Sequence, residues 1–173
     1  NKPILIFAEG NQGKQKKMRP LQKGVFRIGL GAAAKYKEDD VNIIPVGLYY
    51  SDTVNMGAKM LINFGKPMKI NDYLDVYEKD DGSTLNTMKA ELSSRISNLM
   101  VDIQNAEYYD AIHASLFDFD DEINQYEKIK GNKIIDEFNC QKRFIAKAEN
   151  WIKMKPNEAI EWKESSEQLT SLL

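Results

Sequence analysis

Residues 3–13 read PILIFAEGNQG, an apolar run that ends abruptly at a glutamate and a glycine. The run from Pro3 to Phe7 is short, rich in β-favouring residues and apolar throughout, which is typical of a strand buried on both faces of a parallel sheet. Glu9-Gly10 is a turn signal, and polar residues follow it. The stretch therefore predicts a buried strand that leads into an exposed loop.

The segments after this loop alternate between helix and strand patterns. Residues 24–37 carry apolar residues at helical spacing and predict a helix. Its expected core face consists of the apolar residues at that spacing, Val25, Phe26, Ile28, Ala32 and Ala33. Residues 41–50 and 60–64 indicate strands, and Pro45 requires an edge, an end or a bulge because it cannot donate to a ladder. Strand, helix and strand in this order predict a βαβ unit and an α/β fold.

The remainder of the chain is expected to be helical. A helix capped by Ser83 or Thr84 is expected to carry an apolar stripe that continues to residue 103. The chain after residue 107 has a charged helical pattern, which Pro156 breaks. We therefore expect two parts, an α/β part at residues 1–105 and a helical extension at residues 106–173.

Composition limits the class of protein. The chain of 173 residues is 42% hydrophobic and 29% charged with a net charge of −2, which suits one globular core and gives no global reason to expect nucleic-acid binding. No apolar run approaches the ~18 residues that a membrane span needs. One cysteine, Cys140, excludes an intramolecular disulfide framework.

Charge is distributed unevenly along the chain. Residues 1–37 hold nine basic residues and one acid, Glu9, a net charge of +8 that leaves −10 for the other 136 residues. Such asymmetry indicates an anion-handling surface near the N-terminal end. A solvated, lysine-rich loop explains the charge equally well, so both interpretations stay open on charge alone.

Residues 7–13, FAEGNQG, resemble the third sequence block of the glycerolipid acyltransferases, written F-P-E-G-T-R-S. In that family the block precedes a basic loop and a lysine-glycine pair that opens a helix, and Lys23-Gly24 supplies the pair here. Residues 41–46, VNIIPV, stand where the family has its fourth block, V-P-I-V-P-V. Residues 64–67 match a later Phe-Gly-x-Pro feature. The four features occur in the family's order over about residues 3–105.

The resemblance implies an enzyme of the lysophosphatidic acid acyltransferase type. The implied fold is α/β, with a mixed, mostly parallel sheet and flanking helices as in glycerol-3-phosphate acyltransferases, truncated at its N-terminus and followed by the helical extension. The implied reaction transfers a fatty acyl group from acyl-CoA or acyl-ACP to a hydroxyl of a lysophospholipid or glycerol phosphate in phospholipid biosynthesis. No cofactor or metal is expected, because the thioester is a co-substrate. This substrate class implies work at the cytoplasmic face of a membrane.

The basic loop is the expected site for the acceptor phosphate. Glycine permits close approach of the backbone to a ligand, cations give a phosphate charge-assisted hydrogen bonds, and the helix that begins at Gly24 adds a positive end. Together with the resemblance, this indicates a set of substrate-binding residues: Glu9, Gly10, Asn11, Gln12, Gly13, Lys14, Arg19, Lys23 and Pro45. Gln12 replaces the family's arginine and lacks both its positive charge and its forked arrangement of donors. Arg19 or Lys14 is therefore expected to supply the cation, unless the acceptor differs.

The general base of the family is a histidine in an H-x-x-x-x-D pattern, which takes the proton of the acceptor hydroxyl. The family places this pair upstream of the Glu-Gly block, so both residues are expected to lie outside this chain, and the chain alone is expected to be inactive. His113 and Asp118 have the same spacing but stand downstream. His113 is therefore expected to be a helix-surface or partly buried imidazole. Residues 118–122 indicate an acidic helix start, with a hard-cation site as the alternative.

Two other functions remain open. The chain could be a non-catalytic binding module that retains the acyltransferase fold, which the change at Gln12 favours. It could also be a nucleotide-binding P-loop protein, because residues 8–15 approach the pattern G-x-x-x-x-G-K-[ST]. Ala8 stands in place of the first glycine and Gln15 in place of the magnesium-binding hydroxyl, which counts against nucleotide binding.

Overall fold

The computed structural model describes residues 2–10, 13, 15–52, 57–118 and 134–172. The chain divides into two compact units. The first comprises Asn1–Leu48 and Ile62–Met100, and the second comprises Tyr49–Leu61 and Val101–Leu173. The division after Met100 lies close to the expected boundary at residue 106, and the segment from Tyr49 to Leu61 joins the helical part. The assignment of these parts to an acyltransferase domain and an extension stays a prediction.

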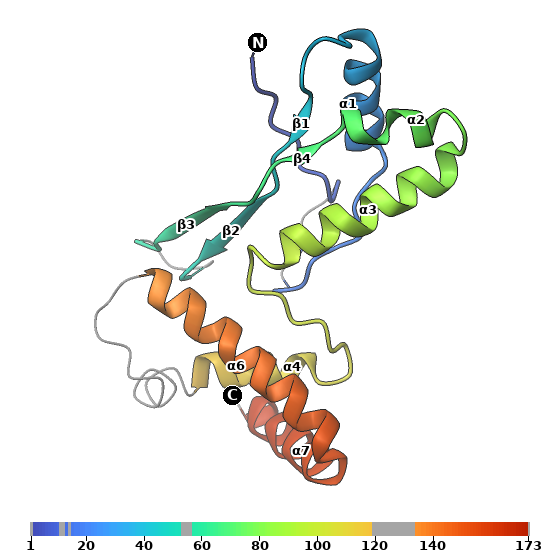
Figure 1. Cartoon of the computed structure of the whole chain (residues 1–173). Coiled ribbons are helices and arrows are strands. Elements are labelled where there is room, and N and C mark those ends of the chain that lie inside the picture. Colours follow the sequence, from blue (N-terminus) through green and yellow to red (C-terminus); the bar gives the residue numbers. More distant parts are fainter. Residues whose placement is uncertain (1, 11–12, 14, 53–56, 119–133, 173) are drawn as a thin grey trace. The chain divides into compact units, whose positions relative to one another are not determined.

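The described strands form two separate two-stranded sheets (Figure 1). The short strands β1 (Asn42–Ile43) and β4 (Met68–Lys69) pair antiparallel. The longer strands β2 (Val46–Tyr50) and β3 (Met60–Phe64) pair with each other. Pro45 separates β1 from β2, as expected of a residue without an amide donor. The mostly parallel sheet implied by the resemblance stays a prediction, since the described strand pairs do not include it.

Two backbone hydrogen bonds fix the hairpin of β2 and β3. The Ser51 amide donates to the Lys59 carbonyl over 3.0 Å near the turn, and the Gly65 amide donates to the Pro45 carbonyl over 2.9 Å at the open end. The residue number thus falls along one strand as it rises along the other, from the Ser51–Lys59 pair to the Pro45–Gly65 pair. The two strands therefore run antiparallel.

Residues 2–7 form no strand, so the expectation of a buried strand at Pro3–Phe7 is wrong. Ile4, Leu5 and Phe7 keep 77%, 77% and 76% of their surface exposed. A strand needs a neighbour to satisfy its backbone amides and carbonyls. Within the described part of the chain, the four strands pair only in the combinations β1–β4 and β2–β3, which leaves this segment without a ladder partner.

The core of the first unit lies where α1 (Gly24–Lys35) and α3 (Asp81–Ser97) meet, with η1 (Asn71–Tyr73) and α2 (Leu74–Tyr77) beside them. Its buried apolar side chains are Leu21, Phe26, Leu30, Ala33, Met68, Ile70, Leu85, Met88 and Leu92. The predicted helix at residues 24–37 is confirmed. Its core face differs from the expected one, because Ile28 is 55% exposed.

Helix α3 begins earlier than expected. Asp80 is its N-cap, and Oδ1 of Asp80 accepts a hydrogen bond from the Ser83 amide over 3.0 Å. Ser83 and Thr84 lie inside the first turn, so neither is the cap. Aspartate caps as well as serine does, and the residue that precedes the helix takes the role. The helix ends at Ser97, which places the rest of the predicted stripe in the following loop.

The second unit packs α4 (Tyr109–Asp118), α6 (Ile134–Met154) and α7 (Pro156–Leu172) together (Figure 1). Pro156 is the first residue of α7, which confirms the predicted break, since proline fits the first helical position. Its buried core comprises Tyr49, Val101, Ile103, Tyr108, Tyr109, Ile112, Leu116, Phe138, Ile145, Ile152 and Ala159.

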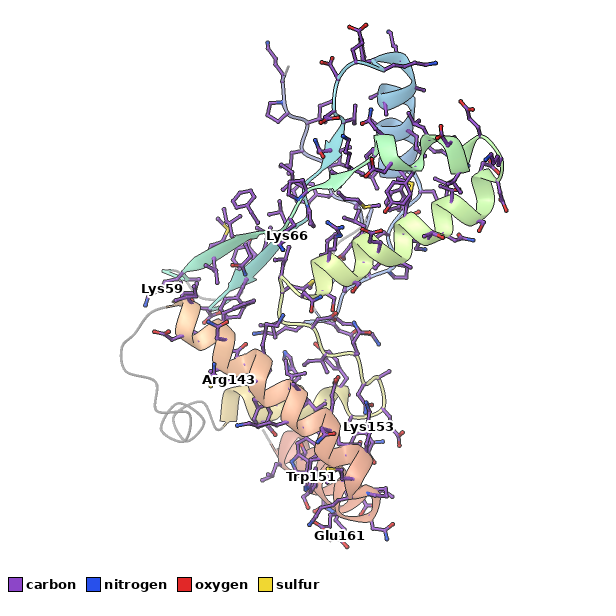
Figure 2. The ribbon with its side chains drawn as sticks, in the orientation of Figure 1. Lys59, Lys66, Arg143, Trp151, Lys153 and Glu161 are labelled. Carbon is purple, nitrogen blue, oxygen red and sulfur yellow. The ribbon has the colours of Figure 1, made fainter. Side chains whose placement is uncertain are left out.

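Aromatic contacts order this second core. Trp151 on α6 lies toward α7 (Figure 2), where its ring meets Trp162 edge to face at 5.8 Å between centroids. Tyr49 meets Phe138 at 5.5 Å, and its hydroxyl donates to the Glu137 carboxylate. Aromatic pairs of this kind add stability beyond their buried area. Among the described helices, none combines the length and apolar character needed to cross a bilayer.

Candidate phosphate-binding site

The predicted site lies in a loop whose two ends are joined by a backbone hydrogen bond. The Gln22 amide donates to the Ala8 carbonyl over 2.8 Å, just before α1 begins. At the entrance, the Gly10 amide donates to the Phe7 carbonyl over 3.2 Å. Gly10 has φ = 75°, a left-handed conformation that favours glycine. The sequence thus makes a tight turn and then a closed loop in front of a helix.

Inside this loop the Arg19 guanidinium lies on the backbone of Gly13. A β-carbon added to Gly13 would lie 1.9 Å from Nη2 and 2.4 Å from Cζ of Arg19. Only a residue without a side chain allows this approach. Gly13 is exposed and Arg19 is half-buried, so the forked donor of Arg19 rests on an open glycine backbone.

The entrance turn has a polar neighbour that the sequence reasoning missed. A β-carbon on Gly10 would lie 3.0 Å from Cγ of Gln22, so the Gln22 side chain covers this turn. The backbone amide of Gln22 also closes the loop, through its bond to the Ala8 carbonyl. The position of Gln22, directly before the Lys23-Gly24 pair, is the signal that could have identified it.

The first turn of α1 follows directly. Lys23 stands at the N-cap position with φ = −68°, is exposed, and makes no side-chain cap hydrogen bond. The first turn contains no acidic residue. The positive end of the helix dipole is therefore not offset by a carboxylate within that turn. This geometry suits an anion.

For Glu9 the structure gives only its burial, and three other predicted site residues lie outside the described part of the chain. Glu9 is half-buried next to the entrance turn. Asn11, Gln12 and Lys14 lie outside the described residues. The geometry of the loop is therefore known from four of the predicted residues: Gly10, Gly13, Arg19 and Lys23. Their role in substrate binding stays a prediction.

Pro45 is buried elsewhere in the first unit, directly before the first residue of β2. A β-carbon on Gly65 would lie 2.8 Å from Cγ of Pro45 and 2.9 Å from Cδ1 of Leu99. The Asn63 side chain donates to the Leu99 carbonyl over 3.0 Å. These contacts give Pro45 a packing role at the end of the hairpin. No described contact brings it to the basic loop.

Arg95 holds the segment that directly follows Gly65. Lys66, the first residue of that segment, is labelled in Figure 2. Nη1 of Arg95 donates to the carbonyls of Lys66 over 3.0 Å and Pro67 over 3.1 Å. Nη2 donates to Oε1 of Glu91 over 2.5 Å. The sequence reasoning missed Arg95, although the i,i+4 spacing of Glu91 and Arg95 on a predicted helix was a usable signal.

Tyr73 completes this cluster by donating its hydroxyl to the other carboxylate oxygen of Glu91. This hydrogen bond, together with Arg95, lowers the pKa of Glu91. Burial raises the pKa of Tyr73 to about 12, and the hydrogen bond to Glu91 acts in the same direction. The cluster holds one carboxylate between a neutral phenol and a guanidinium, an arrangement that favours its charged form.

His113 is a partly buried residue of α4, one of the two placements expected for it. Its ring stacks on Tyr109, one turn earlier on α4, with 5.5 Å between centroids and 16° between planes. The side chain of Asp118 and all of residues 119–122 lie outside the description. In the part of the chain that the structure covers, no group of three His, Cys, Asp or Glu side chains is arranged to hold a metal.

Two curated proteins are similar to this chain. Glycerol-3-phosphate O-acyltransferase 2 of Saccharomyces cerevisiae is 26% identical over 109 residues, which cover 62% of this chain and 14% of that protein. Glycerol-3-phosphate O-acyltransferase 1 of the same yeast is 31% identical over 70 residues, which cover 40% of this chain and 9% of that protein. No family model and no solved structure matches. The chain thus spans a small part of these relatives, and this distant homology relates it to the glycerolipid acyltransferases.

Proposed function

We propose that this chain is the acceptor-binding part of a glycerolipid O-acyltransferase. The complete protein would transfer a fatty acyl group from acyl-CoA or acyl-ACP to a hydroxyl of a lysophospholipid or glycerol phosphate. The observation that carries the proposal is the Arg19 guanidinium on the open backbone of Gly13, in a closed basic loop ahead of α1. The similarity to two yeast glycerol-3-phosphate O-acyltransferases supports it.

The loop offers a phosphate monoester several complementary donors. Arg19 presents a planar fork that matches two phosphate oxygens. The absence of a side chain at residue 13 leaves the space in which this guanidinium lies. Lys23 and the first turn of α1 add positive charge directly after Gln22, the residue that closes the loop. This combination would hold the acceptor by its phosphate and leave its hydroxyl free for the reaction.

The chemical step itself is assigned to residues outside this chain. By the family resemblance, a histidine oriented by an aspartate takes the proton of the acceptor hydroxyl, and the oxygen attacks the thioester carbonyl. The carbon–sulfur bond then breaks, and the thiolate leaves and takes up the proton. Because the acceptor is a lipid or a lipid precursor, we place the complete protein at the cytoplasmic face of a membrane.

Kinetics of the complete protein test this proposal. We expect Arg19→Ala or Lys23→Ala to raise KM for the phosphorylated acceptor about tenfold and to change kcat little, because each removes a charge-assisted hydrogen bond made by substrate and transition state alike. Lys153→Ala removes an exposed cation of α6 (Figure 2) and is the matched control. An unchanged acceptor KM in both loop variants would contradict the assigned site.

A binding module without catalysis is the second candidate, and Gln12 favours it because the family's arginine is replaced. Such a module would bind glycerol 3-phosphate through the same loop, yet the complete protein would show no acyl transfer. The purified chain of 173 residues is expected to show no transfer under either function. Turnover by that chain alone would reinstate His113 as a candidate base.

A further inference from the structure

The helices α6 and α7 of the second unit expose charges of opposite sign. On α6, which the structure describes throughout, the exposed residues include three cations and no acid: Arg143, Lys147 and Lys153. On α7, as far as residue 169, the exposed residues include four acids and no cation: Glu158, Glu161, Glu164 and Glu167. On a solvated helix the two signs usually alternate. Here each helix exposes a single sign.

An apolar seam lies between the two helices. Trp151 precedes Pro156 and Trp162 follows it, and their rings meet at 5.8 Å between centroids, so the chain reverses direction at the proline. Both tryptophans are only half-buried. Met154 and Leu169, on the same two helices, are 72% and 58% exposed. The helical hairpin of α6 and α7 therefore leaves large apolar side chains in contact with solvent.

On α6, a basic row formed by Arg143 and Lys147 borders this seam. Successive residues of a helix are about 100° apart, so Ile152 lies about 100° to one side of Trp151, and Ile152 is buried in the core. Lys147 and Arg143 lie about 40° and 80° to the other side. Both are exposed, and Arg143 is labelled in Figure 2. The basic row therefore stands beside Trp151 on the surface away from the core.

On α7, an acidic row formed by Glu158 and Glu161 borders the seam in the same way. Lys163 lies about 100° to one side of Trp162, and its Nζ lies over the ring of Tyr108, next to α4, at 5.6 Å from the centroid. Glu158 and Glu161 lie about 40° and 100° to the other side, and both are exposed. The face of the hairpin that lies away from α4 thus carries a basic row, an apolar seam and an acidic row.

We propose that this face binds the same face of a second copy of the chain. Two copies can meet through it about a twofold axis that runs along the helices, or about one that runs across them. The axis along the helices places α6 of one copy on α7 of the other, so each basic row meets an acidic row. The axis across the helices places α6 on α6 and opposes like charges. Charge complementarity therefore selects the first arrangement.

The contact is an antiparallel four-helix arrangement around the tryptophans of both copies. Apolar surface at the centre with charge at the rim is the usual anatomy of a protein interface. An anionic bilayer fits this face poorly, because the acidic row would lie against lipid phosphates. The inference does not depend on acyl transfer, since these residues lie outside the proposed acceptor site.

Analytical ultracentrifugation of the purified chain tests the contact. We expect the mass to rise with concentration from 19.8 kDa toward twice that value, and to fall back as salt screens the charged rows. The chain has two tryptophans, and both lie in the seam. Their fluorescence emission should therefore move to shorter wavelength as the dimer forms and excludes water. A chain that stays monomeric up to about 1 mM, or that associates without this shift, would overturn the proposal.

Two charge-reversed variants test which helix meets which. Arg143→Glu with Lys147→Glu makes the basic row acidic, and Glu158→Lys with Glu161→Lys makes the acidic row basic. Each variant alone should dimerise at least about tenfold more weakly, because like charges then meet at both contacts. An equimolar mixture of the two variants should recover the affinity, since every contact then joins opposite charges. Undiminished self-association of either variant alone, or no recovery on mixing folded variants, would contradict the arrangement.

Matched controls separate the face from net charge. Lys66→Glu with Lys79→Glu, and Asp75→Lys with Glu78→Lys, reverse exposed charges of the first unit and change the net charge by the same amounts. Both controls should dimerise as the unsubstituted chain does, and equal weakening in them would overturn the proposal. So would sedimentation with phosphatidylglycerol vesicles that reversal of the basic row abolishes, since a bilayer would then be the occupant.

Discussion

The Arg19 guanidinium occupies the space that a side chain at residue 13 would need. A β-carbon on Gly13 would come within 1.9 Å of Nη2, 2.4 Å of Cζ and 2.6 Å of Nε of Arg19. The two residues are six positions apart and belong to a loop whose ends are joined at Ala8 and Gln22. Glycine at residue 13 and arginine at residue 19 therefore act as a pair.

Gly13→Ala is expected to displace Arg19 and to weaken the binding of glycerol 3-phosphate about tenfold, because a charge-assisted hydrogen bond is lost. The dissociation constant can be measured by NMR titration of the purified chain. Gly31→Ala is the matched control, since a β-carbon there meets nothing within 4 Å. Equal affinity in Gly13→Ala and the unsubstituted chain would show that the Gly13–Arg19 contact takes no part in binding.

Gly47→Ala is expected to destabilise the first unit by about 2–3 kcal/mol, as overpacking does in a filled core. A β-carbon on Gly47 would lie 2.2 Å from the backbone oxygen of Leu99, and the Asn63 side chain already holds that oxygen. Urea unfolding followed by circular dichroism measures the change. Gly31→Ala should instead stabilise slightly, because alanine is the better helix former. An unchanged midpoint for Gly47→Ala would contradict this packing.

The sequence predicted those features that a few neighbouring residues decide. Pro45 interrupts the strand region and Pro156 begins a helix, since a missing amide donor acts locally. The stripe of α1 was less predictable, because residues 25, 26, 28, 30, 32 and 33 are all apolar and form two overlapping faces. Packing against Ile70 and α3 selects one of them. That choice depends on residues more than thirty-five positions further along the chain.

Long-range partners also explain the largest error. Residues 3–7 have the composition of a buried strand, yet composition does not say which strand will pair with them. At the candidate site, the motif predicted the loop, its glycines and Arg19. Gln22 and Arg95 escaped prediction because their roles depend on the contacts they make with Gly10 and with the carbonyl of Lys66.

Glu91→Gln tests the cluster around Arg95 through its pH dependence. The pKa of Glu91 is lowered in the folded chain, so its ionisation contributes stability above the unfolded pKa of about 4.3, and that contribution is lost as pH falls through the folded pKa. We expect the substitution to cost about 0.5–1 kcal/mol near neutral pH. The value is small because the side chains of Glu91 and Arg95 are each 34% exposed and solvent screens them.

The measurement compares urea unfolding of Glu91→Gln and the unsubstituted chain at neutral and at acidic pH. The difference should shrink toward zero at a pH well below 4.3, where the carboxyl is protonated in both states. Glu158→Gln is the control, because its pair with Lys155 is more than half exposed on both sides. A difference that stays constant with pH would mean that packing, rather than charge, dominates at Glu91.

Asp80→Ala is expected to destabilise α3 by about 1 kcal/mol, because the Ser83 amide loses the carboxylate that caps it. Ser83→Ala removes the hydroxyl that the sequence had suggested as the cap. It should cost much less, since the backbone of Ser83, and not its side chain, makes the capping bond. Unfolding followed at the helical circular dichroism band compares the two variants directly. A larger loss for Ser83→Ala would place the start of the helix where the sequence predicted it. Equal losses of stability in the two variants would mean that the Asp80 cap and the Ser83 side chain stabilise the start of α3 to the same degree.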